Sequence, residues 1–180
     1  MSEKRLRNIA IWYCERYLVS SEKLAHYLKK RLYRDVRDDE ERARFSELIP
    51  SIVTDLVALG HADDREAASA RLRSALRSGY AKETAVAIAA SSAMVEREIV
   101  ESELDNALIQ ALPELENIGL VETESATSQA ILALKRAQRG PFRLSDQNDK
   151  SRRRDVAWLQ RRGFRMYAIK MALDIDLLDE

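Results

Sequence analysis

The sequence feature that most constrains the fold of this chain is a glycine–aromatic pair between two stretches with apolar residues at helical spacing. Gly163 and Phe164 follow eight residues that carry apolar side chains at helical spacing. After the pair, the same spacing continues at Met166, Ile169 and Leu173. Glycine can take the left-handed conformation that ends a helix, and the aromatic residue after it can pack back onto the last turn. The pattern predicts a helix, a tight corner and a second helix, with no catalytic group at the corner.

The same order of elements recurs upstream. Gly79 and Tyr80 separate two further helical patterns, and each of the five glycines stands alone at the end of a helical stretch rather than in a phosphate-binding loop. Strand-type alternation is nearly absent, and long breaks divide the sequence into stretches of similar length. We therefore predict an all-α fold: a tandem array of three three-helix units, residues 1–60, 61–118 and 119–180, forming an elongated, curved molecule.

Local signals place several boundaries in this array. Gly60 is expected to end a helix, and Asp63 or Asp64 is expected to cap the next one. Residues 95–111 form one continuous amphipathic pattern, which predicts a single helix. Residues 34–44 are almost entirely charged and hold no apolar period. The sequence leaves open whether this insertion in the first unit is a solvated helix or a loop.

Charge is balanced overall, with 30 Lys and Arg against 30 Asp and Glu, but it is distributed unevenly. Residues 135–170 carry twelve cations and three acids, whereas residues 96–124 carry nine acids and one arginine. Such an asymmetry is typical of a surface that meets an anionic partner. The alternative is a solvated face that balances the acidic block within the same chain. The candidate binding residues are Arg152, Arg153, Arg154, Arg161, Arg162, Arg165 and Lys170.

The residues that catalysis or metal binding would need are sparse. Cys14 is the only cysteine, which excludes an internal disulfide, and it lies in an apolar helical pattern typical of a buried thiol. His26 and His61 have no further ligand at metal-binding spacing. Trp158 is expected in the core, although an aromatic ring near arginines can also stack on a base. We predict no catalytic residue, no metal and no cofactor. No apolar run reaches membrane-spanning length, so we expect a cytoplasmic protein without a membrane partner.

Four motifs carry a resemblance to the RecX family, small helical regulators of the RecA recombinase. Residues 158–164, Trp-Leu-Gln-Arg-Arg-Gly-Phe, resemble the family's corner of leucine, any residue, two arginines, glycine and phenylalanine. Residues 56–64 are similar to its glycine–aspartate junction, and residues 77–80 to its arginine–glycine–tyrosine turn. Residues 21–24 resemble its serine–leucine helix start. Ala93 stands where a glycine is usual, and the charged insertion has no counterpart.

The resemblance implies a monomeric, non-enzymatic protein that lies along the RecA nucleoprotein filament. It also implies weak, non-specific contact with single- or double-stranded DNA. It further implies that the protein modulates the recombinase, ATPase and SOS coprotease activities of RecA in DNA repair and recombination, and we expect this modulation to be inhibition. The residues expected to form structural corners are Gly60, Asp63, Asp64, Gly79, Tyr80, Gly163 and Phe164. The alternative is a free-standing helical nucleic-acid-binding protein that acts through the basic last unit. Its last helix offers mainly Lys170 on the polar side, which argues against sequence-specific reading of bases.

Overall fold

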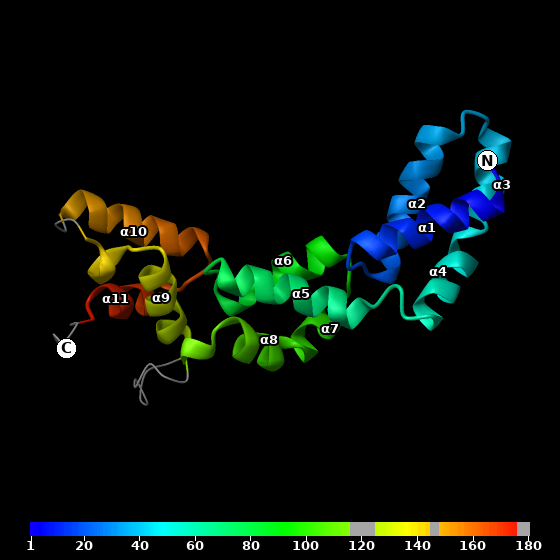
Figure 1. Ribbon diagram of the computed structural model, residues 1–180. Coiled ribbons are helices and arrows are strands. Elements are labelled where there is room, and N and C mark those ends of the chain that lie inside the picture. Colours follow the sequence, from blue (N-terminus) through cyan, green and yellow to red (C-terminus); the bar gives the residue numbers. More distant parts are fainter. Residues whose placement is uncertain (116–124, 145–147, 176–180) are drawn as a thin grey trace. The chain divides into compact units, whose positions relative to one another are not determined.

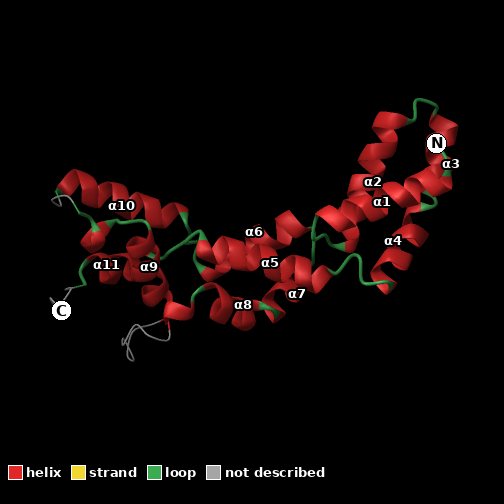
Figure 2. Cartoon of the chain, viewed as in Figure 1, coloured by secondary structure: helices red, strands yellow, loops and turns green. Residues whose placement is uncertain are grey.

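The computed structural model describes residues 1–115, 125–144 and 148–175, and every element in these ranges is helical (Figures 1 and 2). The all-α prediction is confirmed. The α-helices are α1 (Glu3–Arg16), α2 (Ser21–Asp35), α3 (Asp39–Ser46), α4 (Ile49–Ala58), α5 (Asp64–Arg77), α6 (Lys82–Ala93), α7 (Arg97–Ser102), α8 (Leu104–Ala111), α9 (Ser125–Arg136), α10 (Asp149–Arg161) and α11 (Met166–Leu173). Two short 3-10 helices, η1 (Pro113–Leu115) and η2 (Gly140–Phe142), lie between them in the sequence.

The chain consists of two compact units. The first contains Met1–Arg71 and Ala89–Glu103, and the second contains Leu72–Ile88 and Leu104–Glu180. The division falls within α5 and α6. The predicted array of three units stays a prediction.

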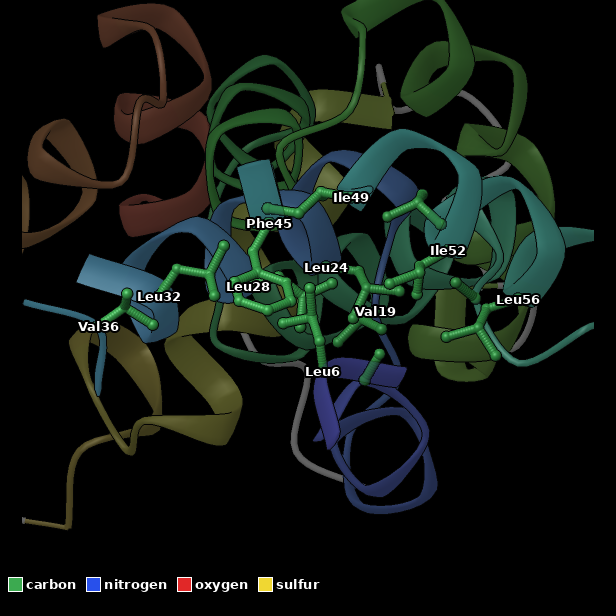
Figure 3. Close-up of a cluster of buried hydrophobic side chains, with 13 residues drawn as sticks. Leu6, Val19, Leu24, Leu28, Leu32, Val36, Phe45, Ile49, Ile52 and Leu56 are labelled. Carbon is green, nitrogen blue, oxygen red and sulfur yellow. The ribbon is translucent and has the colours of Figure 1, made fainter. Parts of the chain in front are cut away.

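The core of the first unit is built from the apolar faces of α1 to α4. Leu24, Leu28 and Leu32 recur every four residues on α2, which places them on one face, and all three are fully buried. Figure 3 shows them in one cluster with Leu6 of α1 and Phe45 of α3. Burying a leucine side chain contributes roughly 2 kcal/mol. This stripe of leucines therefore supplies much of the stability of the four-helix core.

The charged insertion at residues 34–44 is part helix and part connection. α2 runs into it, three residues connect, and α3 follows. The Asp38 carboxylate accepts a hydrogen bond from the Glu41 backbone N–H at 2.7 Å. Acids fill the first turn of α3 and an arginine lies in its last turn, which suits the helix dipole. Val36, before α3, and Phe45, within it, are both buried. A cap and two buried apolar side chains therefore stabilise this helix, although the segment has no regular apolar spacing.

Residues 95–111, predicted as one helix, form the two short helices α7 and α8, so this prediction is wrong. The break lies at Glu103, whose backbone N–H donates to the Val100 carbonyl at 3.2 Å in a 3-10-type bond. The Ser102 hydroxyl donates to a carbonyl three residues earlier at 2.7 Å. The Glu103 carboxylate also pairs with Arg65 at 3.4 Å. The two hydrogen bonds between near neighbours compete with a continuous helix, and the Arg65 pair holds Glu103 at the break; the apolar spacing reveals none of these contacts.

The core of the second unit is formed around α9, α10 and α11. Leu134 and Ile169 are fully buried in it. Met166, expected on the buried stripe of α11, is instead 44% exposed, and Ala168 and Ala172 lie buried on the same helix as Ile169. Small side chains on the buried face let α11 approach its neighbours closely, which apolar spacing alone does not predict.

Two side chains that the sequence assigned to the core lie at the edges of these clusters. Cys14 is only partly buried against the first cluster, and burial raises the pKa of its thiol. Trp158 is partly buried against the second cluster. Each prediction of a core position is therefore confirmed only in part.

Among the described residues, five helices end with a left-handed residue. In each, the N–H of the following residue donates to a carbonyl five residues back, as in the Schellman motif. Three of the left-handed residues are the predicted Gly60, Gly79 and Gly163, with φ of +74°, +81° and +85°. The other two are Met94 and Gln138, with φ of +57° and +51°. Met94 follows the position where the RecX-like pattern usually has glycine, so the corner forms there without one.

Candidate nucleic-acid interface

α10 carries most of the predicted binding residues, and both of its ends are fixed. At its start, Asn148 Oδ1 accepts from the Ser151 backbone N–H at 2.9 Å, and Ser151 Oγ accepts from the Asn148 backbone N–H at 3.0 Å. This is a capping box. At its end, Gly163 turns the chain and Phe164 packs, 6% exposed, into the second core. Because both ends are held, α10 presents a defined face to solvent.

The solvent face of α10 is a stripe of cations. Each helical residue is turned by about 100° from the one before. Lys150, Arg153, Arg154 and Arg161 therefore fall within an arc of about 100°, opposite the fully buried Leu159. All four are exposed, and none forms an ion pair with another described residue. We call these four residues the α10 basic stripe. Its three arginines are among the residues predicted from the sequence to bind, whereas Lys150 is not.

The other predicted binding residues lie outside this stripe. Arg152 pairs with Asp174 at 2.5 Å. Arg165 and Lys170 are exposed and form no ion pair within the described ranges, but they belong to the cap and body of α11. Arg162 is engaged with aromatic rings. The structure therefore separates the predicted cluster of seven cations into a stripe, a paired arginine, a packed arginine and two cations on α11.

Arg162 belongs to the glycine–tyrosine corner that follows α5. Its guanidinium carbon lies 3.8 Å from the centre of the Trp158 ring and 5.4 Å from that of Tyr80. Its Nε donates to the Ser78 carbonyl at 3.4 Å, and its own carbonyl accepts from the Ala81 N–H at 2.9 Å. A cation held between two rings and a carbonyl stabilises this corner, so Arg162 has a structural role there.

Trp158 has guanidinium groups over its ring. Besides Arg162, the guanidinium carbon of Arg139 lies 5.1 Å from the ring centre. Burial lowers the pKa of Arg162, the nearby charge of Arg139 lowers it further, and Tyr80 opposes the shift. The ring is therefore already occupied by cations where a stacked base would have to lie.

One acid of the basic segment, Asp155, is buried and joins α10 to the turn before it. It is 1% exposed and accepts hydrogen bonds from Arg139 Nη1 at 2.9 Å, from Arg143 Nη2 at 2.8 Å to each oxygen, and from the Gly140 N–H at 3.0 Å. Burial alone would raise the pKa of this carboxyl, but these hydrogen bonds outweigh burial and lower it. The sequence could have indicated that Asp155 is buried, because it lies four residues before Leu159 on the same helical face.

The acidic block leaves the α10 basic stripe without counter-charges among the described residues. One described ion pair joins that block to the basic segment, between Glu114 and Arg136 at 2.8 Å. The hydrogen bond from Arg136 lowers the pKa of Glu114. Glu101 pairs within its own block, with Arg97 at 2.6 Å. The contacts therefore do not support internal charge balance as the role of the stripe.

The aspartates of the glycine–aspartate junction have different roles. The Asp63 carboxylate accepts from the Glu66 N–H at 2.9 Å and so caps α5, as predicted. The Asp64 carboxylate instead accepts from the Ser21 backbone N–H at 2.6 Å and from the Ser21 hydroxyl at 3.0 Å. It therefore joins the start of α5 to the start of α2. Ser20, which caps α2, donates its hydroxyl to the Ala93 carbonyl.

A second surface of cations and aromatic side chains, which was not predicted from the sequence, lies on α2. Lys29 and Lys30 are exposed and form no ion pair within the described ranges. Tyr33 is 75% exposed, with the Arg42 guanidinium carbon 4.5 Å from its ring centre. His26 is exposed on the same face. The two lysines and Tyr33 follow His26 by three, four and seven positions, which places them on one side of a helix. That spacing could have identified this face from the sequence.

Within the described residues, no group of three or more His, Cys, Asp or Glu side chains is placed to hold a metal ion. No described helix is long and apolar enough to cross a membrane. Comparison of the chain with protein-family models, curated proteins and solved structures gave no match. A function must therefore be inferred from the residues of the chain itself.

Proposed function

We propose that this chain is a non-enzymatic regulator that binds the RecA recombinase on its nucleoprotein filament, as the resemblance to the RecX family implies. In this proposal the protein acts as a monomer, without a cofactor, and inhibits recombinase, ATPase and SOS coprotease activity. The α10 basic stripe contacts phosphates of the filament's DNA. The observation that carries the proposal is that the four sequence motifs behind the resemblance meet in pairs.

The first pair of motifs is joined through carboxylate hydrogen bonds. Residues 21–24 and 56–64 meet where Asp64 accepts from Ser21. The second pair, residues 77–80 and 158–164, meets where Arg162 lies over the Tyr80 ring and donates to the Ser78 carbonyl. Segments distant in sequence but similar to one family thus serve one structural task each. A chance likeness of short motifs does not lead one to expect these contacts.

The α10 basic stripe supports the nucleic-acid part of the proposal. Lys150 and Arg161 are eleven residues apart, which spans roughly 16 Å along a helix. Phosphates along one strand of a duplex are separated by about 3.4 Å of axis. The stripe can therefore face several phosphates, and the planar forks of its arginines suit phosphate oxygens. Its lack of described counter-charges leaves these groups available.

The second candidate is a free-standing nucleic-acid-binding protein. The exposed cations of the α10 basic stripe and of α2 favour it, because phosphate contacts alone supply non-specific binding. The two candidates differ in what they bind best. A filament regulator prefers the assembled recombinase on single-stranded DNA, whereas a free-standing binder prefers bare DNA.

The test is co-sedimentation of the full chain with RecA filaments assembled on single-stranded DNA, beside bare DNA and free RecA. We expect the filament to retain the chain at concentrations where bare DNA does not. ATP hydrolysis and strand exchange by the filament should fall as the chain is added. Preferential binding to bare DNA, without any effect on hydrolysis, would favour the second candidate.

Two matched variants distinguish the effect of the α10 basic stripe on binding from the effect of net charge. Arg153, Arg154 and Arg161 are replaced by alanine in one variant, and Lys4, Arg5 and Arg37 in the other. Both lose three exposed positive charges from described positions without a described ion pair. We expect only the first to lose most of its filament binding and inhibition. Equal losses in the two variants would show that net charge, and not the stripe, determines binding.

A further inference from the structure

A cavity of about 220 Å³ lies within the second unit, lined by the Gly79–Tyr80 corner, by α9 and by the end of α10. Its volume is below the roughly 300–1,000 Å³ typical of drug-sized ligands. It can therefore hold a small group, such as one nucleobase. Tyr80 and Trp158 contribute aromatic surface to its wall.

A buried amide lines this cavity without a partner. Gln129 of α9 is 4% exposed, and its Nε2 is buried with no hydrogen bond to the described part of the chain. Leu112 and Leu132, which also line the cavity, are buried and apolar. A buried donor without an acceptor destabilises a fold, and folded proteins keep few of them. The amide is thus suited to an acceptor atom brought by a ligand.

The charged groups of the cavity are all of one sign among the described residues. Arg77, Arg136 and Arg162 line it, and no described Asp or Glu does. Arg77 is exposed and Arg162 is half-buried, whereas Gln129 is almost fully buried. The site therefore offers a neutral donor at its buried part and cations at its more exposed parts.

We propose that this cavity binds a nucleotide, with a base carbonyl oxygen accepting from Gln129 Nε2 and the phosphate meeting Arg77 and Arg162. Such a ligand carries a neutral acceptor at one end and an anion at the other. Its base ring can pack against the apolar wall of Leu112 and Leu132, because cations already cover the Trp158 ring. An inorganic anion would satisfy the arginines but leave the amide unpaired. A free nucleotide and a nucleotide within a single strand share this chemistry. The inference is independent of the proposed function, because neither recombinase nor filament takes part in the binding.

Trp158 provides the signal for a direct test on the full chain. In a Trp12→Phe background it is the only tryptophan, so its fluorescence reports occupation of the cavity it lines. The probes are thymidine 5′-monophosphate, single-stranded oligothymidylate, the duplex of that strand with oligoadenylate, and inorganic phosphate. We expect a saturable change with the first two and binding weaker by about tenfold or more with phosphate, since phosphate cannot pair the amide. Tighter binding of the oligonucleotide than of the monophosphate identifies a single strand as the source. The paired bases of the duplex should give no saturable change.

Three substitutions assign the signal to the proposed contacts. Gln129→Leu removes the donor and should weaken nucleotide binding about tenfold, while raising the urea midpoint because an unpaired buried group is lost. That rise separates lost binding from lost folding. Arg77→Ala should also weaken binding, since Arg77 is exposed and outside the core. Gln110→Leu, an exposed change on α8 that does not line the cavity, should leave binding as in the parent.

Two results would overturn the proposal. One is the absence of a saturable Trp158 signal with both nucleotide sources at millimolar concentration. The other is a Gln129→Leu variant that binds the nucleotide as tightly as its parent. Binding of inorganic phosphate as tight as that of the nucleotide would refute the role given to the base.

Discussion

Replacing Gly163 by alanine tests the corner between α10 and α11, and the chain holds a matched control at Gly60. Both residues are left-handed, with φ of +85° and +74°, and alanine in that conformation costs about 1 kcal/mol. At Gly60, an added Cβ would meet nothing within 4 Å. At Gly163, it would overlap the Thr84 hydroxyl oxygen and lie 2.9 Å from Thr84 Cβ. Overpacking of this kind costs a further 1–3 kcal/mol, roughly. The free energy of unfolding should therefore fall by about 1 kcal/mol for Gly60→Ala and by about 2–4 kcal/mol for Gly163→Ala.

A double-mutant cycle with Thr84 isolates the steric part. Thr84→Ala removes the hydroxyl and the methyl group but leaves the Cβ that an alanine at 163 would meet at 2.9 Å. We expect Gly163→Ala to cost about 1 kcal/mol less in the Thr84→Ala background than in the parent. The remaining loss combines the backbone strain, which no change at Thr84 can relieve, with the 2.9 Å contact to the Cβ that alanine keeps.

Urea unfolding measures these differences. Far-ultraviolet circular dichroism follows both units, and the fluorescence of Trp158 in a Trp12→Phe background follows the second unit. Equal losses for Gly60→Ala and Gly163→Ala would refute the packing argument. A Thr84→Ala background that rescues nothing would refute the contact with Thr84 in particular.

Three further predictions follow from other contacts. Gln138→Gly should raise the free energy of unfolding by about 0.5–1 kcal/mol in urea titrations, because glycine takes the exposed residue's left-handed φ of +51° without strain. Asp155 has a pKa below its ordinary value, so its contribution to stability is present above the unfolded-state pKa and is lost as pH falls through the lower folded-state pKa. Asp155→Asn should cost roughly 3 kcal/mol at pH 7 and flatten the decline of stability below about pH 4, which a Tm series against pH would show. Replacing Arg153, Arg154 and Arg161 by alanine should reduce the magnitude of the salt slope for single-strand binding by about two, since each phosphate contact contributes about 0.7; fluorescence anisotropy titrations from low to high salt would show an unchanged slope if the stripe makes no phosphate contact.

Helical spacing was sufficient to predict the fold class and most of the buried faces. Leu24, Leu28 and Leu32 lie where their period places them, and Gly163 is left-handed as expected. The corner at Met94 escaped prediction because no glycine marks it. Its left-handed conformation is imposed by the chain around it, at a cost that a sequence pattern does not record.

The candidate site was only partly predictable, because charge in a sequence does not say which cations are already paired. Arg152 and Arg162 counted equally with Arg153 and Arg154, yet one is paired with a carboxylate and the other lies between aromatic rings. The cavity around Gln129 could not be predicted from the sequence for a related reason. A polar residue in an amphipathic helix is assigned to the solvent face unless its burial is known.

The buried Asp155 limits how the affinity of this chain for an anion could be raised by substitution. A charge count suggests that deleting an acid from the most basic segment should tighten its hold on an anion. The carboxylate, however, is what Arg139, Arg143 and the Gly140 N–H hold in common, so it fixes α10 against the turn that precedes it. Deleting it would raise the net charge of the segment by one, through loss of a negative charge, but it would also release the helix that aligns the arginines of the α10 basic stripe. A buried acid is thus required for the cations of this region to stay aligned on one helix.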